Sequence, residues 1–91
     1  MRIVIYPGTF DPIHSGHIDI AERASSLFDK LIFAVAVNND KKPLFSAEER
    51  IDMIMESMQH VDNVEAFSTE GLVADFARDY NAVAIIRGLR H

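Results

Sequence analysis

The fold is decided by one stretch, Tyr6-Pro7-Gly8-Thr9-Phe10-Asp11-Pro12-Ile13-His14-Ser15-Gly16-His17, which joins an apolar run to an amphipathic one. The apolar residues before it and the helical pattern after it predict a strand-loop-helix junction. Gly8 and Gly16 carry no Cβ, so backbone N–H groups there can approach a ligand closely. The free N–H groups at the start of a helix favour an anion at the same place. The junction is therefore a candidate phosphate site.

Two imidazoles stand at the predicted helix start, because His14 and His17 are three residues apart and share a face. The stretch contains neither a Walker loop nor a G-x-G-x-x-G sequence, so its phosphate signal depends on these histidines. The alternative is that both residues only cap the helix or lie on the surface. The pattern Gly-Thr-Phe-Asp-Pro-x-His-x-Gly-His resembles the signature of the nucleotidyltransferase superfamily. That resemblance implies transfer of a nucleotide α-phosphate to another phosphate, with release of pyrophosphate.

Composition narrows the class of protein. The chain has 91 residues, which allows one domain at most, and 48% of them are hydrophobic and 25% charged, as in ordinary soluble proteins. The formal net charge of −5 argues against nucleic acid or an anionic membrane as a partner. The absence of cysteine excludes disulfides and thiolate metal sites. No signal peptide or membrane span is predicted, so we expect a cytoplasmic location.

Strand-like and helix-like segments alternate along the whole sequence. This order predicts an α/β fold, a Rossmann-like doubly wound parallel sheet with helices on both faces. Ser46 and Glu49 form a capping box that marks the start of the second helix. The predicted strands are 2–6, 31–37, 64–67 and 82–86, and the predicted helices are 16–29, 46–61 and 72–80. With no helix left to cover the fourth strand, we expect residues 1–91 to be the N-terminal part of the domain, truncated after that strand.

Basic and imidazole side chains follow three different predicted strands. The His-x-Gly-His loop follows the first strand, Lys41-Lys42 follow the second, and Arg87 and Arg90 follow the fourth. In parallel sheets the ligand lies beyond the carboxyl ends of the strands, so these groups are expected on one edge. Each could instead be a solvated surface charge. Their convergence is the main argument from the residues for a polyphosphate site.

Four further pieces of sequence extend the resemblance to one family. They are 6–12, Lys41-Lys42-Pro43-Leu44-Phe45 with Glu48-Glu49-Arg50, Asp75-Phe76-Ala77-Arg78, and Ile86-Arg87-Gly88-Leu89-Arg90. Over all 91 residues the chain resembles the N-terminal portion of the bacterial phosphopantetheine adenylyltransferases. Members of that family continue with a Ser/Thr-rich segment that grips the ATP phosphates, and the chain does not contain it. We therefore expect weak or no activity from the 91 residues alone.

The resemblance implies which residues contact the acceptor, 4′-phosphopantetheine. Thr9 would contact both substrates, and Val73 would touch the pantetheine arm. Lys41 would hold the phosphate of the acceptor and act as a catalytic cation, and Arg87 would assist at the same phosphate.

The resemblance also implies the nucleotide contacts. His17 would bind the ATP phosphates and stabilise the transition state, and Phe10 would contact the nucleotide through its backbone. Gly88, Leu89 and Arg90 would line the adenine and ribose side, with Arg90 a further catalytic donor. Such a reaction needs positioning and charge stabilisation, and neither a side-chain nucleophile nor a general base.

Cofactor and assembly are also implied by the resemblance: Mg²⁺ as cofactor, ATP as the second substrate, and a cytoplasmic homo-oligomer, a hexamer in the family. Asp11 is expected to brace the loop through an Asx-turn rather than to bind the metal, and no residue is assigned as a metal ligand. His14 departs from the family, which more often has Thr there, and His91 departs from its usual small residue. His14 also occurs in the nicotinate-mononucleotide adenylyltransferases, so that activity remains an alternative, as does a non-catalytic nucleotide-binding fragment.

Overall fold

A parallel sheet organises the chain. The computed structural model describes residues 1–38 and 42–87. Its strands are β1 (Ile3–Gly8), β2 (Lys30–Ala36), β3 (Val64–Thr69) and β4 (Ala84–Ile85), in the spatial order β3-β2-β1-β4. Every neighbouring pair is parallel, which confirms the predicted Rossmann-like α/β class.

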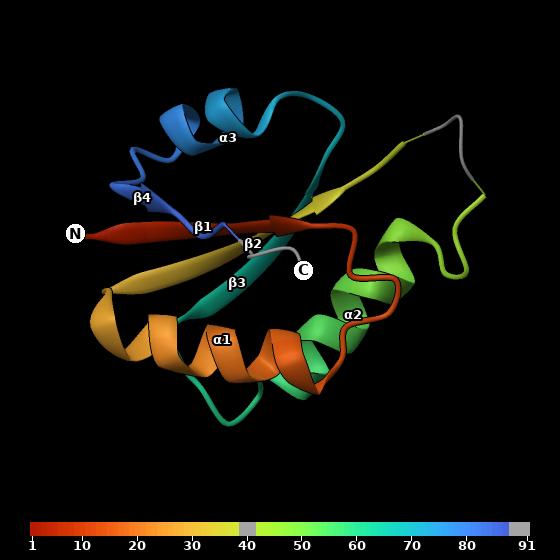
Figure 1. Cartoon of the computed structure of the whole chain (residues 1–91), viewed down its shortest axis with the longest axis horizontal. Coiled ribbons are helices and arrows are strands. Elements are labelled where there is room, and N and C mark those ends of the chain that lie inside the picture. Colours follow the sequence, from red (N-terminus) through yellow and green to blue (C-terminus); the bar gives the residue numbers. More distant parts are fainter. Residues whose placement is uncertain (39–41, 88–91) are drawn as a thin grey trace.

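Three helices connect the strands: α1 (Ser15–Leu27), α2 (Ala47–Ser57) and α3 (Val73–Asp79). α1 and α2 cover one face of the sheet and α3 covers the other (Figure 1). The chain moves outward from β1 to β2 and β3, and then crosses to the far side of β1 to form β4. The strand order therefore reverses at β1, and the carboxyl ends of β1 and β4 flank the switch point where such sheets hold ligands.

The core divides into two layers because successive strand residues point to opposite faces. β2 is buried over five consecutive residues, as a central parallel strand should be. The layer under α1 and α2 contains Val4, Tyr6, Phe10, Ala21, Ala24, Leu31, Phe33, Val35, Ile54, Met58 and Val64. The layer under α3 contains Ile5, Ile32, Ala34, Phe76 and Ala77.

The predicted element bounds were wrong at some ends. α1 begins one residue early, because His14 is its N-cap. β3 runs on to Thr69, because its last residues pair with the end of β2. The fourth strand is shorter than the predicted 82–86, although the N–H groups of Val83 and Ile86 still donate to carbonyls of β1. Nowhere in residues 1–38 and 42–87 is a helix long and apolar enough to cross a membrane.

The capping box of α2 is confirmed. The Glu49 N–H donates to Ser46 Oγ at 3.1 Å, and the Ser46 N–H donates to Glu49 Oε1 at 2.9 Å. We expect Ser46→Ala to lower the free energy of unfolding by about 1 kcal/mol, because a helix N–H loses its partner. Urea denaturation measures this loss. Ser26→Ala is the control, since the Ser26 hydroxyl donates to a carbonyl within α1 and caps nothing. Equal losses in the two variants would contradict the capping role.

Candidate functional site

The loop between β1 and α1 is anchored to the core by Phe10. This side chain is only 3% exposed, and its ring packs edge-on against Tyr6 and Phe33. The Phe10 backbone has a φ of 49°, in the left-handed region that non-glycine residues rarely adopt, and a cis peptide bond joins Asp11 to Pro12. The Phe10 ring also contacts His17, with ring centroids 4.8 Å apart. The core therefore extends through Phe10 to the imidazole at the helix start.

His14 and His17 cap α1 reciprocally. The His14 N–H donates to His17 Nδ1 at 3.1 Å, and the Gly16 N–H donates to His14 Nδ1 at 3.1 Å. The two rings are stacked, with centroids 3.7 Å apart. The alternative that these histidines cap the helix is thus correct as a description of their geometry. Capping uses Nδ1 alone, so each neutral ring carries its proton on Nε2 and retains that N–H as a donor.

Gly16 has a reason for being glycine that the sequence did not reveal. A Cβ at this position would lie 2.9 Å from His14 Cε1 and 3.1 Å from His14 Nδ1, too close for the imidazole to stay in place. The glycine therefore makes room for the stacked histidine pair. The close approach of a ligand at Gly16 stays a prediction.

His17 favours its neutral form. Partial burial lowers the pKa of His17 below its ordinary value of 6.5, and the neighbouring His14 charge lowers it further. A lowered pKa in the folded state means that the unfolded chain binds more protons in this range. The corresponding stability is fully present above pH 6.5 and is lost as the pH falls through the folded-state value. Near neutral pH, His17 thus presents an uncharged Nε2–H donor at the start of α1.

We expect His14→Asn to raise the pKa of His17, because asparagine keeps an N-cap acceptor but removes the neighbouring titrating charge. Burial remains, so the pKa should stay below 6.5. Titration of the His17 Cε1 proton by NMR measures the shift, with His60→Asn, in the turn after α2, as the control. An unchanged His17 pKa in His14→Asn would show that the two rings do not interact electrostatically.

A second set of contacts joins this loop to the segment before α2 and to α2 itself. The Asp11 carboxylate accepts the N–H groups of Leu44 at 2.7 Å and Phe45 at 2.9 Å. Asp11 therefore braces the loop, as predicted, but through a distant segment and not through a local Asx-turn. Both of its carboxylate oxygens are occupied by these contacts.

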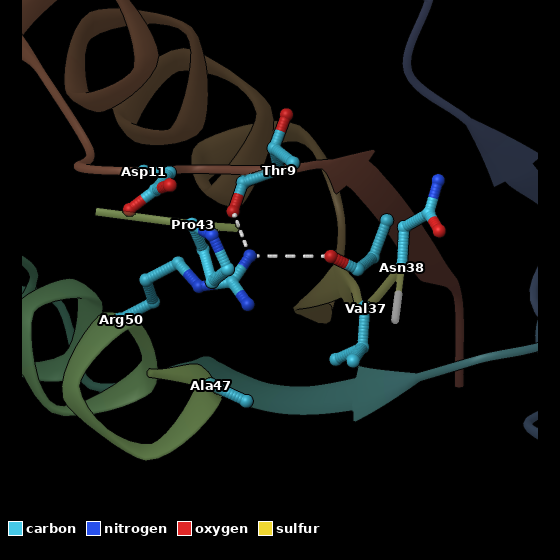
Figure 2. Close-up of a pocket in the computed structure, with 8 residues that line it drawn as sticks. Thr9, Asp11, Val37, Asn38, Pro43, Ala47 and Arg50 are labelled. Atoms are coloured by element: carbon cyan, nitrogen blue, oxygen red, sulfur yellow. Dashed lines mark hydrogen bonds between the residues drawn. The ribbon is translucent and has the colours of Figure 1, made fainter. Parts of the chain in front are cut away.

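Arg50 contacts the same loop from the side of α2. Its side chain is buried at 3% exposure, and Nη1 donates to the carbonyl oxygens of Thr9 at 3.0 Å and Ala36 at 3.2 Å. Figure 2 shows the guanidinium between the loop after β1 and the end of β2. Arg50 is not among the site residues predicted from the sequence. The available signal was a charged residue at i, i+4 spacing from Ile54, on the buried side of α2.

A cavity of about 250 Å³ lies beside these contacts, at the carboxyl ends of β1 and β2. It occupies the edge of the sheet where parallel α/β folds place ligands. Its lining consists of Thr9, Asp11, Ala36, Val37, Asn38, Pro43, Ala47 and Arg50 (Figure 2).

The predicted site residues can now be placed. Exposed Thr9 and half-buried His17 both lie on the β1 side of the switch point. Arg87 is exposed two residues after β4, and because β4 runs parallel to β1, it lies at the same edge. Val73 begins α3 after β3 and packs against the opposite core layer. Lys41, Gly88, Leu89 and Arg90 lie outside the described residues, so the full convergence of cations stays a prediction.

Comparison with known proteins agrees with this geometry. Residues 5–91 match the sequence model of the cytidylyltransferase-like family. The chain belongs to that family. The strand-loop-helix junction, the histidine pair and the cavity at the strand ends all lie within the matched residues.

Curated relatives of this cytidylyltransferase-like chain carry a common name. The phosphopantetheine adenylyltransferase of Carboxydothermus hydrogenoformans is 56% identical over 90 residues, which are 99% of this chain and 56% of the relative. That of Haemophilus ducreyi is 58% identical over 87 residues, 96% of this chain and 54% of the relative. That of Clostridium botulinum strain Alaska E43 is 53% identical over 99% of this chain and 57% of the relative. The chain spans just over half the length of these relatives.

A solved structure shares the same cytidylyltransferase-like architecture. The lipopolysaccharide core biosynthesis protein from Thermoplasma volcanium superposes with a TM-score of 0.72 at 30% identity. The match covers 93% of this chain and 72% of that protein.

Proposed function

We propose that this chain forms the nucleotide-binding part of an enzyme that transfers AMP from ATP to 4′-phosphopantetheine. The products would be dephospho-coenzyme A and pyrophosphate. The observation that carries the proposal is the Nε2–H of His17, held at the start of α1 by its own capping bond and kept neutral by burial. The acceptor is suggested by the name of relatives that are 53 to 58% identical to this chain.

The reaction would need donors around the phosphates and little else from the protein. An oxygen of the acceptor phosphate attacks the α-phosphorus of ATP, the bond from that phosphorus to the β-phosphate oxygen breaks, and pyrophosphate leaves. The attacking phosphate is already an anion, so no base is required. His17 donates Nε2–H to the oxygens on which charge develops, and the free N–H groups of α1 act alongside it. Lys41 and Arg90 supply further positive charge.

The substrates would lie across the switch point. Lys41 and Arg87 hold the phosphate of 4′-phosphopantetheine, and Val73 contacts its pantetheine arm. Thr9, which lines the cavity, would contact both substrates. The nucleotide is contacted by the Phe10 backbone and, on the adenine and ribose side, by Gly88, Leu89 and Arg90.

Mg²⁺ fits this site as an ion that arrives with ATP. Among the residues that the structure describes, no group of three His, Cys, Asp or Glu side chains could hold a metal. Asp11 already accepts two backbone N–H groups. Mg²⁺ in nucleotide sites takes much of its coordination from substrate phosphates and water, and there it neutralises phosphate charge. The protein residues then position the phosphates themselves.

The assembly and location that we propose follow the family resemblance: a homo-oligomer, a hexamer in the complete enzyme, in the cytoplasm. The net charge of −5 agrees with small anionic substrates held by local donors and not with nucleic acid as a partner. Light scattering of the purified protein measures the oligomer directly.

The experiment that tests the function supplies the complete enzyme, in which these 91 residues are joined to the rest of the family domain, with ATP, Mg²⁺ and one acceptor at a time. We expect pyrophosphate release with 4′-phosphopantetheine and none with nicotinate mononucleotide, which is the matched acceptor. Release with nicotinate mononucleotide alone would establish the alternative transferase. ATP binding without release from either acceptor would instead favour a non-catalytic nucleotide-binding fragment. The first outcome is the one that the relatives' names support.

A further inference from the structure

Arg50 is a buried cation whose partners are backbone carbonyls. Its guanidinium contacts Thr9 after β1, Ala36 at the end of β2 and, through Nε at 3.4 Å, Ser46 before α2. In the described part of the chain no ion pair joins it to a carboxylate. A buried charge is costly unless its donors are satisfied, so these three carbonyls are what allows Arg50 to be buried.

Arg50 and Asp11 both connect the loop after β1 to the region of α2. The Arg50 side chain comes from the helix, and the Asp11 side chain comes from the loop. Arg50 reaches from α2 to the loop that follows β1, and Asp11 reaches from that loop to the N–H groups of Leu44 and Phe45. Each contact uses a charged side chain, which makes stronger hydrogen bonds than a neutral one. The loop is therefore held at Thr9 by α2 and at Asp11 by the segment before α2.

Helix packing alone does not require an arginine here. A lysine or methionine could fill the same space beside Ile54, but Arg50 uses two nitrogens, Nε to Ser46 and Nη1 to Thr9 and Ala36. A lysine ammonium has three donors on a single atom, whereas the planar guanidinium spreads its donors over a rigid fork that suits such a junction. Arg50 and the carbonyl-bearing residues Thr9 and Ala36 all line the cavity. Arg50 therefore joins α2 to the part of the cavity wall that the ends of β1 and β2 supply.

We propose that Arg50 is a positioning residue for adenylyl transfer. It fixes the loop that carries Thr9 and leads to His17 at a set distance from the end of β2, so that donors from both strand ends meet one substrate. This inference rests on the proposed function for its catalytic consequence. Its structural half, the coupling of Arg50 to the Asp11 contacts, is tested without any substrate.

The first experiment measures amide hydrogen exchange in Arg50→Lys. Lysine keeps the charge but has a single nitrogen in place of Nε and Nη1, so it cannot keep the Ser46 contact together with those to Thr9 and Ala36. The loop should then loosen, and Asp11 should release its partners more often. We expect exchange at Leu44 and Phe45 to rise about tenfold, as for the loss of one hydrogen bond of ordinary strength. Ile54→Val is the matched control, because it weakens the same helix in the core and leaves all three Arg50 contacts in place. Equal exchange at Leu44 and Phe45 in the two variants would overturn the coupling.

The second experiment measures turnover and the KM for ATP with 4′-phosphopantetheine as acceptor. We expect Arg50→Lys to lower kcat about 100-fold, with a much smaller change in KM, because misplaced donors cost most in the transition state. Ile54→Val should keep its kcat at temperatures where it is folded. A loss of kcat that only follows the loss of folded protein in both variants would make Arg50 a structural residue and overturn the positioning role.

The two experiments separate the failure of each idea. If the unsubstituted complete enzyme transfers AMP to neither acceptor, the proposed function fails, and the exchange at Leu44 and Phe45 still decides whether Arg50 holds the loop. If the unsubstituted chain is active and Arg50→Lys has normal kcat, the positioning role fails while the function stands.

Discussion

His17→Ala is expected to lower kcat by 10²- to 10³-fold, a loss of about 3 to 4 kcal/mol of transition-state stabilisation, while ATP binding weakens far less. The reason lies in the geometry of the imidazole. Nδ1 is occupied by the His14 N–H, so Nε2–H is the one ring donor left for a phosphate oxygen, and its bond strengthens as charge develops there. Steady-state kinetics and ATP titration measure the two effects. Equal losses in turnover and in binding would refute the differential role.

A matched variant separates catalysis from capping. His17→Gln at the third position of the helix can still accept the His14 N–H through its side-chain oxygen, as in an ordinary capping box, and it keeps an N–H donor. We expect its stability to match that of the unsubstituted chain and its turnover to lie between those of the histidine and alanine forms. His60→Ala, in the turn after α2, is the control for loss of an imidazole elsewhere. If Gln and Ala variants lose turnover equally, the donor is not what His17 provides.

Phe10→Ala is expected to lower the free energy of unfolding by about 3 to 5 kcal/mol, since it empties a buried aromatic site. The ring lies between Tyr6, Phe33 and His17, so the loss also removes the support beneath the imidazole. For a chain of this length such a loss is a large share of the total stability. Urea denaturation measures it, and histidine NMR signals report whether His17 keeps its environment.

The backbone conformation of Phe10 can be tested with a second substitution at the same position. With a φ of 49°, this residue adopts a conformation that costs a side-chain-bearing residue about 1 to 2 kcal/mol relative to glycine. Phe10→Gly removes the same ring but relieves that cost, so it should be about 1 kcal/mol more stable than Phe10→Ala. This is the reverse of the usual order of alanine and glycine. If Phe10→Ala proves the more stable of the two, the left-handed conformation of the loop is contradicted.

Much of the fold could be predicted from the sequence because its signals are local. The apolar run 31–37 is short and ends at Asn38-Asn39-Asp40, which favours a buried central strand, and Ser46 with Glu49 identifies a helix start from two residues. The short β4 could not be delimited in this way. Its length is set by how many residues pair with β1, and this pairing is a tertiary contact that local sequence does not encode.

The candidate site was predictable in its location and less so in its construction. The strand-helix alternation placed Thr9, His17 and Arg87 at one edge, because all parallel strands end there. The capping pair of histidines and the contacts of Arg50 and Asp11 join residues through backbone carbonyls and N–H groups. Almost every residue carries the same backbone donor and acceptor, so the residue types do not indicate which backbone group a side chain will bind.

The brevity of β4 has a consequence for how the sheet closes around a ligand. Two register pairs hold this strand to β1, so fraying at this border should require less free energy than parting β1 from β2, which share six pairs. Arg87 lies two residues beyond β4, and its anchorage can be no firmer than that of the strand before it. An anion bound by both Arg87 and the loop after β1 would hold β4 against β1 and oppose fraying of their pairing.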